Sequence, residues 1–134
     1  MTAAMLGWVA LGSALGGVAR VWVVNRMHVL AGDDFPYGTL LVNLTGALLA
    51  GMLVAALPGI ADGTAPLQYQ LLLVGLLGSY TTASSFSLQT LALLRQRRPG
   101  AAAVNACVTL AGCLLAIATG YGIVAWAVVW GGGG

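Results

Sequence analysis

The sequence predicts an all-α membrane protein with four transmembrane helices. Of its 134 residues, 60% are hydrophobic and only 6% are charged, whereas a soluble domain carries roughly 25% charged residues. A helix needs about 20 apolar residues to cross the hydrocarbon core of a bilayer. Three polar segments divide the chain into four apolar stretches of sufficient length, and too few residues remain for a soluble domain.

The first two helices are expected over about residues 3–24 and 37–57. Pro58 and Gly59 end the second helix, because proline cannot continue a helix and glycine favours the turn that closes one. No positively charged segment typical of a secretory signal peptide precedes the first apolar run, so we expect that run to be a permanent helix. The polar loop between these helices holds Arg26, His28, Asp33 and Asp34.

The third and fourth helices are expected over about residues 67–94 and 101–130, separated by an arginine-rich loop that ends in Pro99. We treat residues 1–130 as one four-helix unit and the glycines of 131–134 as a flexible tail. Small residues spaced by four form helix faces that allow close packing in lipid. Two such pairs are Gly12 with Gly16, and Gly46 with Ala50.

The arginines indicate how the bundle is inserted. Four crossings put the first and third loops on one side, and these loops hold four of the five basic residues, Arg26, Arg95, Arg97 and Arg98. Because cytoplasmic loops carry the excess of Lys and Arg, we predict one orientation in the plasma (inner) membrane, with both termini outside and these loops cytoplasmic. The net charge of +2 is too small to suggest a nucleic-acid partner.

The third helix contains a stretch crowded with hydroxyl groups, residues 78–87. Polar side chains at bilayer depth are costly unless they find partners, and hydroxyls beside a glycine compete for main-chain hydrogen bonds and favour a break in mid-membrane. Freed main-chain groups are tolerated there only inside protein or beside water. The stretch therefore predicts an ion site, although an unbroken helix whose hydroxyls bond to their own carbonyls remains the alternative.

Polar side chains of the second and fourth helices allow two interpretations. Asn43 offers two donors and an acceptor in the middle of its helix, and Asn105, Thr109 and Cys113, spaced by four, share one helix face. Each set fits either an ion path or interhelical hydrogen bonds that hold the bundle together. Arg20 is the one charge inside a predicted span, and it either reaches the interface or binds loop carbonyls.

The residues missing from the predicted spans exclude other functions. Asp33, Asp34 and Asp62 all lie in loops, and no Glu or Lys occurs. A small multidrug-type exporter couples transport to a membrane carboxylate, which this pattern does not supply. The sequence also shows no nucleophile with a base, no metal-binding His/Cys cluster and no phosphate-binding loop, so we do not expect an enzyme.

Three motifs in order resemble those of the Fluc/CrcB family of fluoride channels. They are residues 16–20 (GGVAR), residues 38–43 (GTLLVN) followed by Gly46 and Gly51, and residues 78–86 (GSYTTASSF), which are similar to a motif written GGxTTFSTF. The resemblance covers nearly the whole chain. It implies an antiparallel dimer of four-helix subunits with two pores along the interface, and passive efflux that lowers cytoplasmic fluoride and protects the cell.

The resemblance also implies roles for particular residues. A structural Na⁺ that is not transported would lie at the dimer centre, held by the main-chain carbonyls of Gly78 and Thr81. Arg20 and Thr39, in the first two motifs, would be structural. Fluoride would pass an amide, hydroxyls and the positive edge of an aromatic ring, with the polar face of the fourth helix beside them. Those residues are Asn43, Ser84, Ser85, Phe86, Asn105 and Thr109.

Ala83 departs from the family pattern, because it replaces the first phenylalanine of the third motif and removes one ring edge from a pore. A subunit locked in one orientation needs a partner locked in the other. We therefore weigh a heterodimer with a related, oppositely inserted subunit against a homodimer that inserts in both orientations. A non-conducting partner subunit within a heterodimeric channel is a further alternative.

Overall fold

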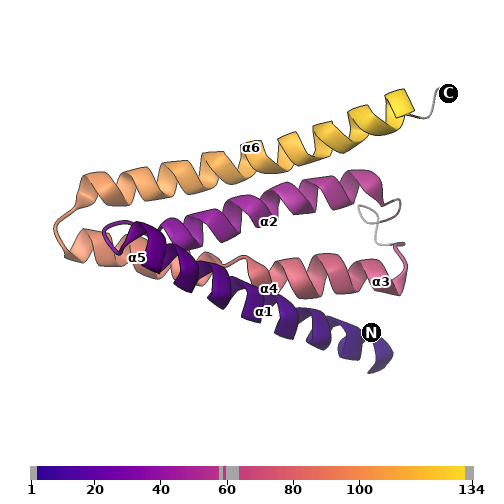
Figure 1. Ribbon diagram of the computed structural model, residues 1–134, viewed down its shortest axis with the longest axis horizontal. Coiled ribbons are helices and arrows are strands. Elements are labelled where there is room, and N and C mark those ends of the chain that lie inside the picture. The colour runs from indigo at the N-terminus through magenta and orange to yellow at the C-terminus, as the bar shows by residue number, and fades with distance from the viewer. Residues whose placement is uncertain (1–2, 58, 60–63, 132–134) are drawn as a thin grey trace.

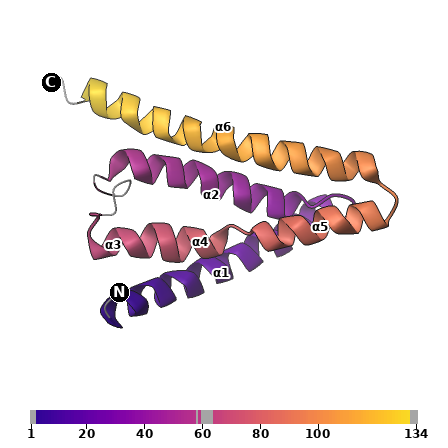
Figure 2. The same ribbon diagram turned by 180° about the vertical axis from the view of Figure 1, so that it is seen from behind.

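The computed structural model describes residues 3–57, 59 and 64–131 (Figure 1). Within these residues every regular element is a helix, and four helical stretches are long and apolar enough to cross a membrane, which agrees with the predicted fold class. The elements α3, η1, α4 and α5 follow one another in a single line, which we call the third rod (Figures 1 and 2). The helices are α1 (Ala3–Ala31), α2 (Tyr37–Ala56), α3 (Leu67–Gln70), the π-helix η1 (Leu71–Leu77), α4 (Gly78–Tyr80), α5 (Ala83–Arg95) and α6 (Pro99–Gly131).

Helix α1 extends past the predicted end near Val24, so Arg26 and His28 belong to the helix and not to a loop. Polar side chains do not by themselves end a helix, and residues 18–31 contain neither proline nor glycine. The helix ends at Gly32, whose positive φ of 74° suits glycine and whose N–H donates to the His28 carbonyl at 3.0 Å.

Helix α6 also extends beyond its predicted bounds. It begins at Pro99, since proline fits the first position of a helix. Gly131, the first residue of the predicted tail, is its last helical residue. The other tail residues, 132–134, and the acidic Asp62 lie outside the described part of the chain.

Glycines bring α1 into main-chain contact with the third rod. A Cβ on Gly16 would overlap the Leu76 carbonyl, and a Cβ on Gly75 would lie 2.8 Å from the Val9 carbonyl oxygen. The predicted close packing at Gly12 and Gly16 is confirmed, because both are buried against η1. The π-helical winding of η1 itself has no signal in the sequence.

Helices α2 and α6 approach each other in the same way. A Cβ on Gly51 would overlap the Ile117 carbonyl, and one on Gly120 would overlap the Leu48 carbonyl. In lipid, apolar side chains gain little by leaving the hydrocarbon, so dispersion contacts between closely spaced main chains hold such helices together. This pair of helices forms one wall of the molecule, with α2 between α6 and the third rod (Figures 1 and 2).

The two chain ends lie at one end of the bundle, and the α1–α2 and α5–α6 connections lie at the other (Figures 1 and 2). The Arg98 guanidinium Nη1 joins these two connections by donating to the Asp34 carbonyl at 2.7 Å. Arg26 near the end of α1, Arg95 at the end of α5, and Arg97 and Arg98 in the connection after it therefore belong to one end of the bundle.

Polar side chains share the interior with a few apolar ones, Val42, Leu77, Leu93 and Ala102 among the described residues, and apolar side chains cover the outside. Among the described residues, the buried polar ones are Thr39, Asn43, Thr82, Asn105 and Thr109. Large apolar side chains of α1 and α6 are instead exposed, Trp22, Leu114 and Trp126 among them. This inverted pattern suits a lipid environment and directs attention to the buried amides and hydroxyls.

Candidate functional site

The third rod changes its winding at Thr81 and Thr82, between α4 and α5 (Figure 2). Both residues have extended main chains, with φ/ψ of −80°/160° at Thr81 and −153°/116° at Thr82. The Thr81 N–H and hydroxyl both donate to the Leu77 carbonyl, at 3.0 and 3.1 Å, and close the preceding helix. The Thr82 hydroxyl oxygen accepts the Ser85 N–H at 3.2 Å and caps α5.

Asn43 of α2 satisfies the main chain of Thr82 at both of its polar groups. Its Oδ1 accepts the Thr82 N–H at 2.8 Å, and its Nδ2 donates to the Thr82 carbonyl at 3.1 Å. The two residues are only 8% and 7% exposed. Of the two interpretations of Asn43, the structure shows the interhelical hydrogen bond. The second N–H of the Asn43 amide takes no part in these two bonds.

Two main-chain carbonyls lose their helical donors at this point. In a continuous α-helix, the N–H of Thr82 would donate to the Gly78 carbonyl, and the N–H of Ser85 to the Thr81 carbonyl. Here these donors bond to Asn43 Oδ1 and to the Thr82 hydroxyl instead. Gly78 and Thr81 are the residues whose carbonyls the family resemblance assigns to Na⁺, and carbonyl oxygens suit a hard cation.

Three hydroxyls form a cluster at the start of α5. The Thr82 hydroxyl donates to Ser85 Oγ at 3.2 Å and lies 3.2 Å from Ser84 Oγ. Because a hydroxyl carries a single proton, Ser84 must donate to Thr82 in the second contact. The proton of Ser85 is therefore the one that the cluster leaves available, and Ser85 is half-buried whereas Ser84 is exposed.

The polar residues of α6 differ in their bonding. Asn105, 2% exposed, donates through Nδ2 to the Thr90 hydroxyl at 2.8 Å, and Thr90 donates to the Phe86 carbonyl at 2.7 Å, so this chain of bonds joins α6 to α5. Thr109 is 6% exposed, and its buried hydroxyl oxygen has no hydrogen-bond partner among the described residues. Buried polar groups are nearly always paired. The Thr109 hydroxyl is an exception, and it therefore has a donor and an acceptor available for another group.

These elements enclose an open groove of about 620 Å³ between α2, the junction of α4 with α5, and α6. Most of its lining is apolar, and Cys113 and Ala83 lie along it. The groove brings together five of the predicted site residues, namely Asn43, Gly78, Thr81, Phe86 and Thr109. Ser84, Ser85 and Asn105 are not in its lining but are linked to residues near it by the bonds described above.

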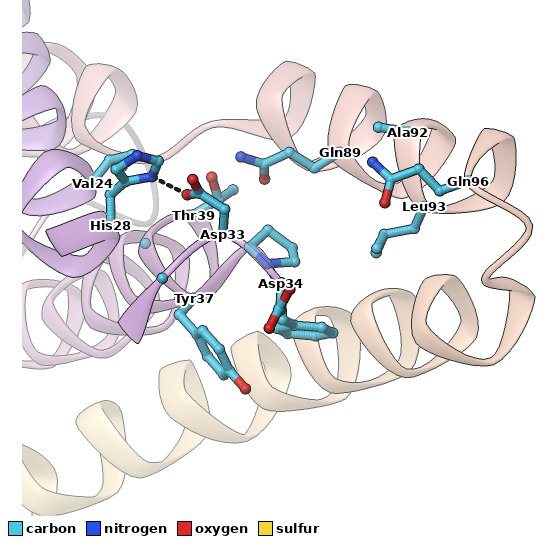
Figure 3. A pocket seen from close by; sticks show the side chains of 14 residues that line it. Val24, His28, Asp33, Asp34, Tyr37, Thr39, Gln89, Ala92, Leu93 and Gln96 are labelled. Atoms are coloured by element: carbon cyan, nitrogen blue, oxygen red, sulfur yellow. Dashed lines mark ion pairs between the residues drawn. The ribbon is translucent and has the colours of Figure 1, made fainter. Parts of the chain in front are cut away.

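The structure does not bring Arg20 or Thr39 to the groove. Arg20 is half-buried on α1 and makes no hydrogen bond or ion pair within the described chain, and it is Arg98 that binds a loop carbonyl. Thr39 is buried on α2 and lines a smaller pocket near the α1–α2 connection (Figure 3). The structural roles predicted for Arg20 and Thr39 stay predictions.

Sequence reasoning missed the central residue of the site, Thr82. Its hydroxyl and main chain together contact Asn43, Ser84 and Ser85. The available signal was a threonine three residues before Ser85, which is the pattern of a helix N-cap. Tyr80 was also missed, and its hydroxyl lies 3.0 Å from that of Thr45 on α2.

Four apolar spans with amides and hydroxyls gathered in one groove define a small multi-pass membrane protein whose chemistry lies in its interior. The family model described as CrcB-like protein, Camphor Resistance (CrcB), matches residues 7–121. The chain belongs to this family, and the resemblance drawn from its three motifs is confirmed.

Relatives of known name share much of the sequence. The chain is 45% identical over 104 residues to the fluoride-specific ion channel FluC of Coxiella burnetii (strain Dugway 5J108-111), covering 78% of this chain and 84% of the relative. It is 41% identical over 124 residues to the FluC of Methylocella silvestris, with 90% and 92% covered. FluC 4 of Brucella abortus is 38% identical over 127 residues, with 92% and 94% covered.

Proposed function

We propose that this chain is a subunit of a passive, fluoride-selective channel and not an enzyme. Its relatives carry the name of fluoride-specific ion channels over most of their length. The observation that carries the proposal is the bonding of Asn43 to the main chain of Thr82. This bonding holds an extended segment beside the groove, with hydroxyls and freed carbonyls next to one another.

The donors around the groove suit a small, strongly hydrated anion. A pore for fluoride must replace water with hydrogen-bond donors, and the free N–H of Asn43, the hydroxyls of Ser85 and Thr109 and the ring edge of Phe86 are of that kind. No arginine lies in the groove lining. A fixed cationic side chain would hold the anion tightly, whereas conduction requires that it leave.

The carbonyls of Gly78 and Thr81 would hold a structural Na⁺ at the centre of a dimer. Support comes from the hydrogen bonds that divert both of their helical donors and from the oxygen chemistry that a hard cation prefers. A bound Na⁺ would supply positive charge that offsets part of the cost of an anion between low-dielectric walls. Asn43 and the Thr82 hydroxyl would act by keeping these carbonyls free.

A second, antiparallel subunit would cover the open groove and complete two pores. With the loop arginines at one end of the molecule, we propose insertion in the inner membrane with both termini outside, so that efflux lowers cytoplasmic fluoride. The partner would be a related subunit inserted in the opposite sense, or this chain itself if it inserts both ways. Ala83 favours the heterodimer, because a second subunit would then supply the pore with its full set of rings.

The test compares fluoride and chloride efflux from liposomes that contain the chain alone or with a related subunit encoded beside it. We expect fluoride efflux without chloride efflux, no requirement for a proton gradient, and full activity only in the mixed sample. Efflux that follows the proton gradient would indicate that the protein is an exporter and not a channel. Robust efflux from the chain alone would indicate that it functions as a homodimer and not as a heterodimer.

A non-conducting partner subunit is the second candidate, and Ala83 is the observation that favours it. In the mixed channel, Phe86→Leu in this chain should lower fluoride efflux if its own groove conducts. The matched control is Trp126→Leu, which changes an exposed aromatic residue of α6 that lines neither the groove nor the smaller pocket. Unchanged efflux in both variants would assign this chain a scaffolding role.

A further inference from the structure

A second, smaller pocket of about 160 Å³ lies at the end of the bundle that carries the α1–α2 connection (Figure 3). It is bordered by the last turns of α1, the connection after Gly32, the start of α2 and one face of α5. Gln89 and Gln96 of α5 extend toward it from one side, and Asp33 and Thr39 from the other (Figure 3). None of these side chains has a part in the groove.

The charged groups in the lining are acidic in balance. Two of the three acidic residues of the chain, Asp33 and Asp34, line the pocket, and none of the five arginines does. His28 pairs with one carboxylate oxygen of Asp33, which leaves the second oxygen outside that pair. The start of α2 has no side-chain cap, so these carboxylates are not engaged in capping it.

One buried oxygen that faces the pocket lacks a partner. The Gln89 Oε1 atom is buried and has no hydrogen bond with any described residue. Thr39 is 4% exposed and also lines the pocket. Since buried polar atoms are almost always satisfied by protein, water or an ion, an unpaired acceptor oxygen beside two carboxylates favours a cationic ligand.

We propose that this pocket binds a hard divalent cation, partly hydrated, through the carboxylates of Asp33 and Asp34 and the side-chain oxygens of Thr39 and Gln89. The volume of 160 Å³ corresponds to about five waters at roughly 30 Å³ each, more than a bare ion needs. A small divalent ion bound by one or two carboxylates keeps several waters, so the space and the ligands agree.

The consequence for transport rests on the proposed channel function. On α2, Thr39 lies one turn before Asn43, and on α5, Gln89 lies one turn after Phe86, so the pocket continues the groove along the same helix faces. Two carboxylates at this end would repel an approaching anion. A bound divalent cation offsets that repulsion, and fluoride flux then depends on the divalent concentration at this face.

Binding is tested without transport by titrating Tb³⁺ into the full chain in detergent micelles, because Tyr37 lines the pocket and can transfer excitation to a nearby lanthanide. We expect saturable emission that Mg²⁺ or Ca²⁺ displaces and K⁺ does not. Asp34→Asn and Gln89→Leu should each weaken the Tb³⁺ affinity by about tenfold or more. Asp62→Asn, the same change in the acidic residue outside this connection, should leave it unchanged.

Tb³⁺ emission that does not saturate would overturn the proposal. Equal weakening of Tb³⁺ binding by Asp34→Asn and Asp62→Asn would do the same, and in either case water would be the occupant of the pocket. The transport consequence is measured separately, as fluoride efflux with and without Mg²⁺. Specific Tb³⁺ binding with Mg²⁺-independent efflux would keep the site and overturn its link to flux. Specific binding without any fluoride efflux would keep the site and reject the channel.

Discussion

At the scale of single residues, Asn43 is the group on which the site geometry depends. It pairs with both polar groups of one extended residue, Thr82, in a buried position. Each buried group left without its partner costs about 1–3 kcal/mol. The same amide keeps the Thr82 N–H away from the Gly78 carbonyl, so the proposed Na⁺ binding would be linked to stability through one side chain.

Asn43→Leu should therefore lower the free energy of unfolding by about 2–6 kcal/mol, the sum for two orphaned main-chain groups, and abolish fluoride efflux. Thermal melting in detergent measures the first effect. Asn25→Leu is the matched control, because Asn25 is exposed on α1. Equal melting temperatures for the two variants would contradict the role given to Asn43.

Thr109 and Thr90 permit a contrast between ion path and packing. Thr109→Val removes a hydroxyl that has no partner, so it should leave melting unchanged or raised while reducing fluoride flux about tenfold, the equivalent of one hydrogen bond. Thr90→Val breaks the bonds to Asn105 and Phe86 and should lower stability by about 1–2 kcal/mol. Unaltered flux in Thr109→Val would remove this residue from the path.

At the scale of helices, the contact of α1 with η1 depends on the missing side chain of Gly16. Gly16→Ala should destabilise the protein by about 1–3 kcal/mol, because the added Cβ meets the Leu76 main chain, which cannot move aside. Gly17→Ala is the control, since a Cβ there meets nothing within 4 Å and alanine favours a helix by about 1 kcal/mol. Opposite shifts in melting temperature are expected, and shifts of equal sign would refute the contact.

The helices were predictable to different degrees. Hydropathy suffices for four spans, and glycine spacing suffices for the face of α1 that packs on η1. The end of α1 was misplaced because Arg26 and His28 are compatible with a helix that leaves the apolar region, and charge does not stop winding. The partner of Asn43 was not predictable, because periodicity identifies a face and not the residue opposite it.

At the scale of the whole molecule, the arginine-bearing end should govern insertion. A reporter fused to the C-terminus should be found outside the cell in the wild-type chain, since four of the five arginines lie in or next to the α1–α2 and α5–α6 connections. Replacing Arg95, Arg97 and Arg98 by serine should give a mixture of both orientations. A mixture already in the wild-type chain would support a homodimer that inserts both ways.

The site could be predicted only as a set of residue types. The hydroxyl-rich motif and Asn43 were identified, and the groove contains five of the predicted residues. Whether Asn105 faces an ion or a neighbouring helix depends on helix rotation, and its bond to Thr90 is set by packing that no local pattern encodes. The pocket near Asp33 was missed for a similar reason, since its lining comes from two distant segments, residues 24–39 and 89–96.

The bonds that shape the junction of α4 and α5 all begin and end within one chain: Thr81 to Leu77, Thr82 to Asn43, and Ser85 to Thr82. None of these bonds requires a second subunit. A newly inserted chain can therefore form the extended segment at Thr81 and Thr82 by itself. In the proposed dimer, assembly would then join two preformed surfaces, and its rate should be set by encounter in the membrane plane and not by main-chain rearrangement.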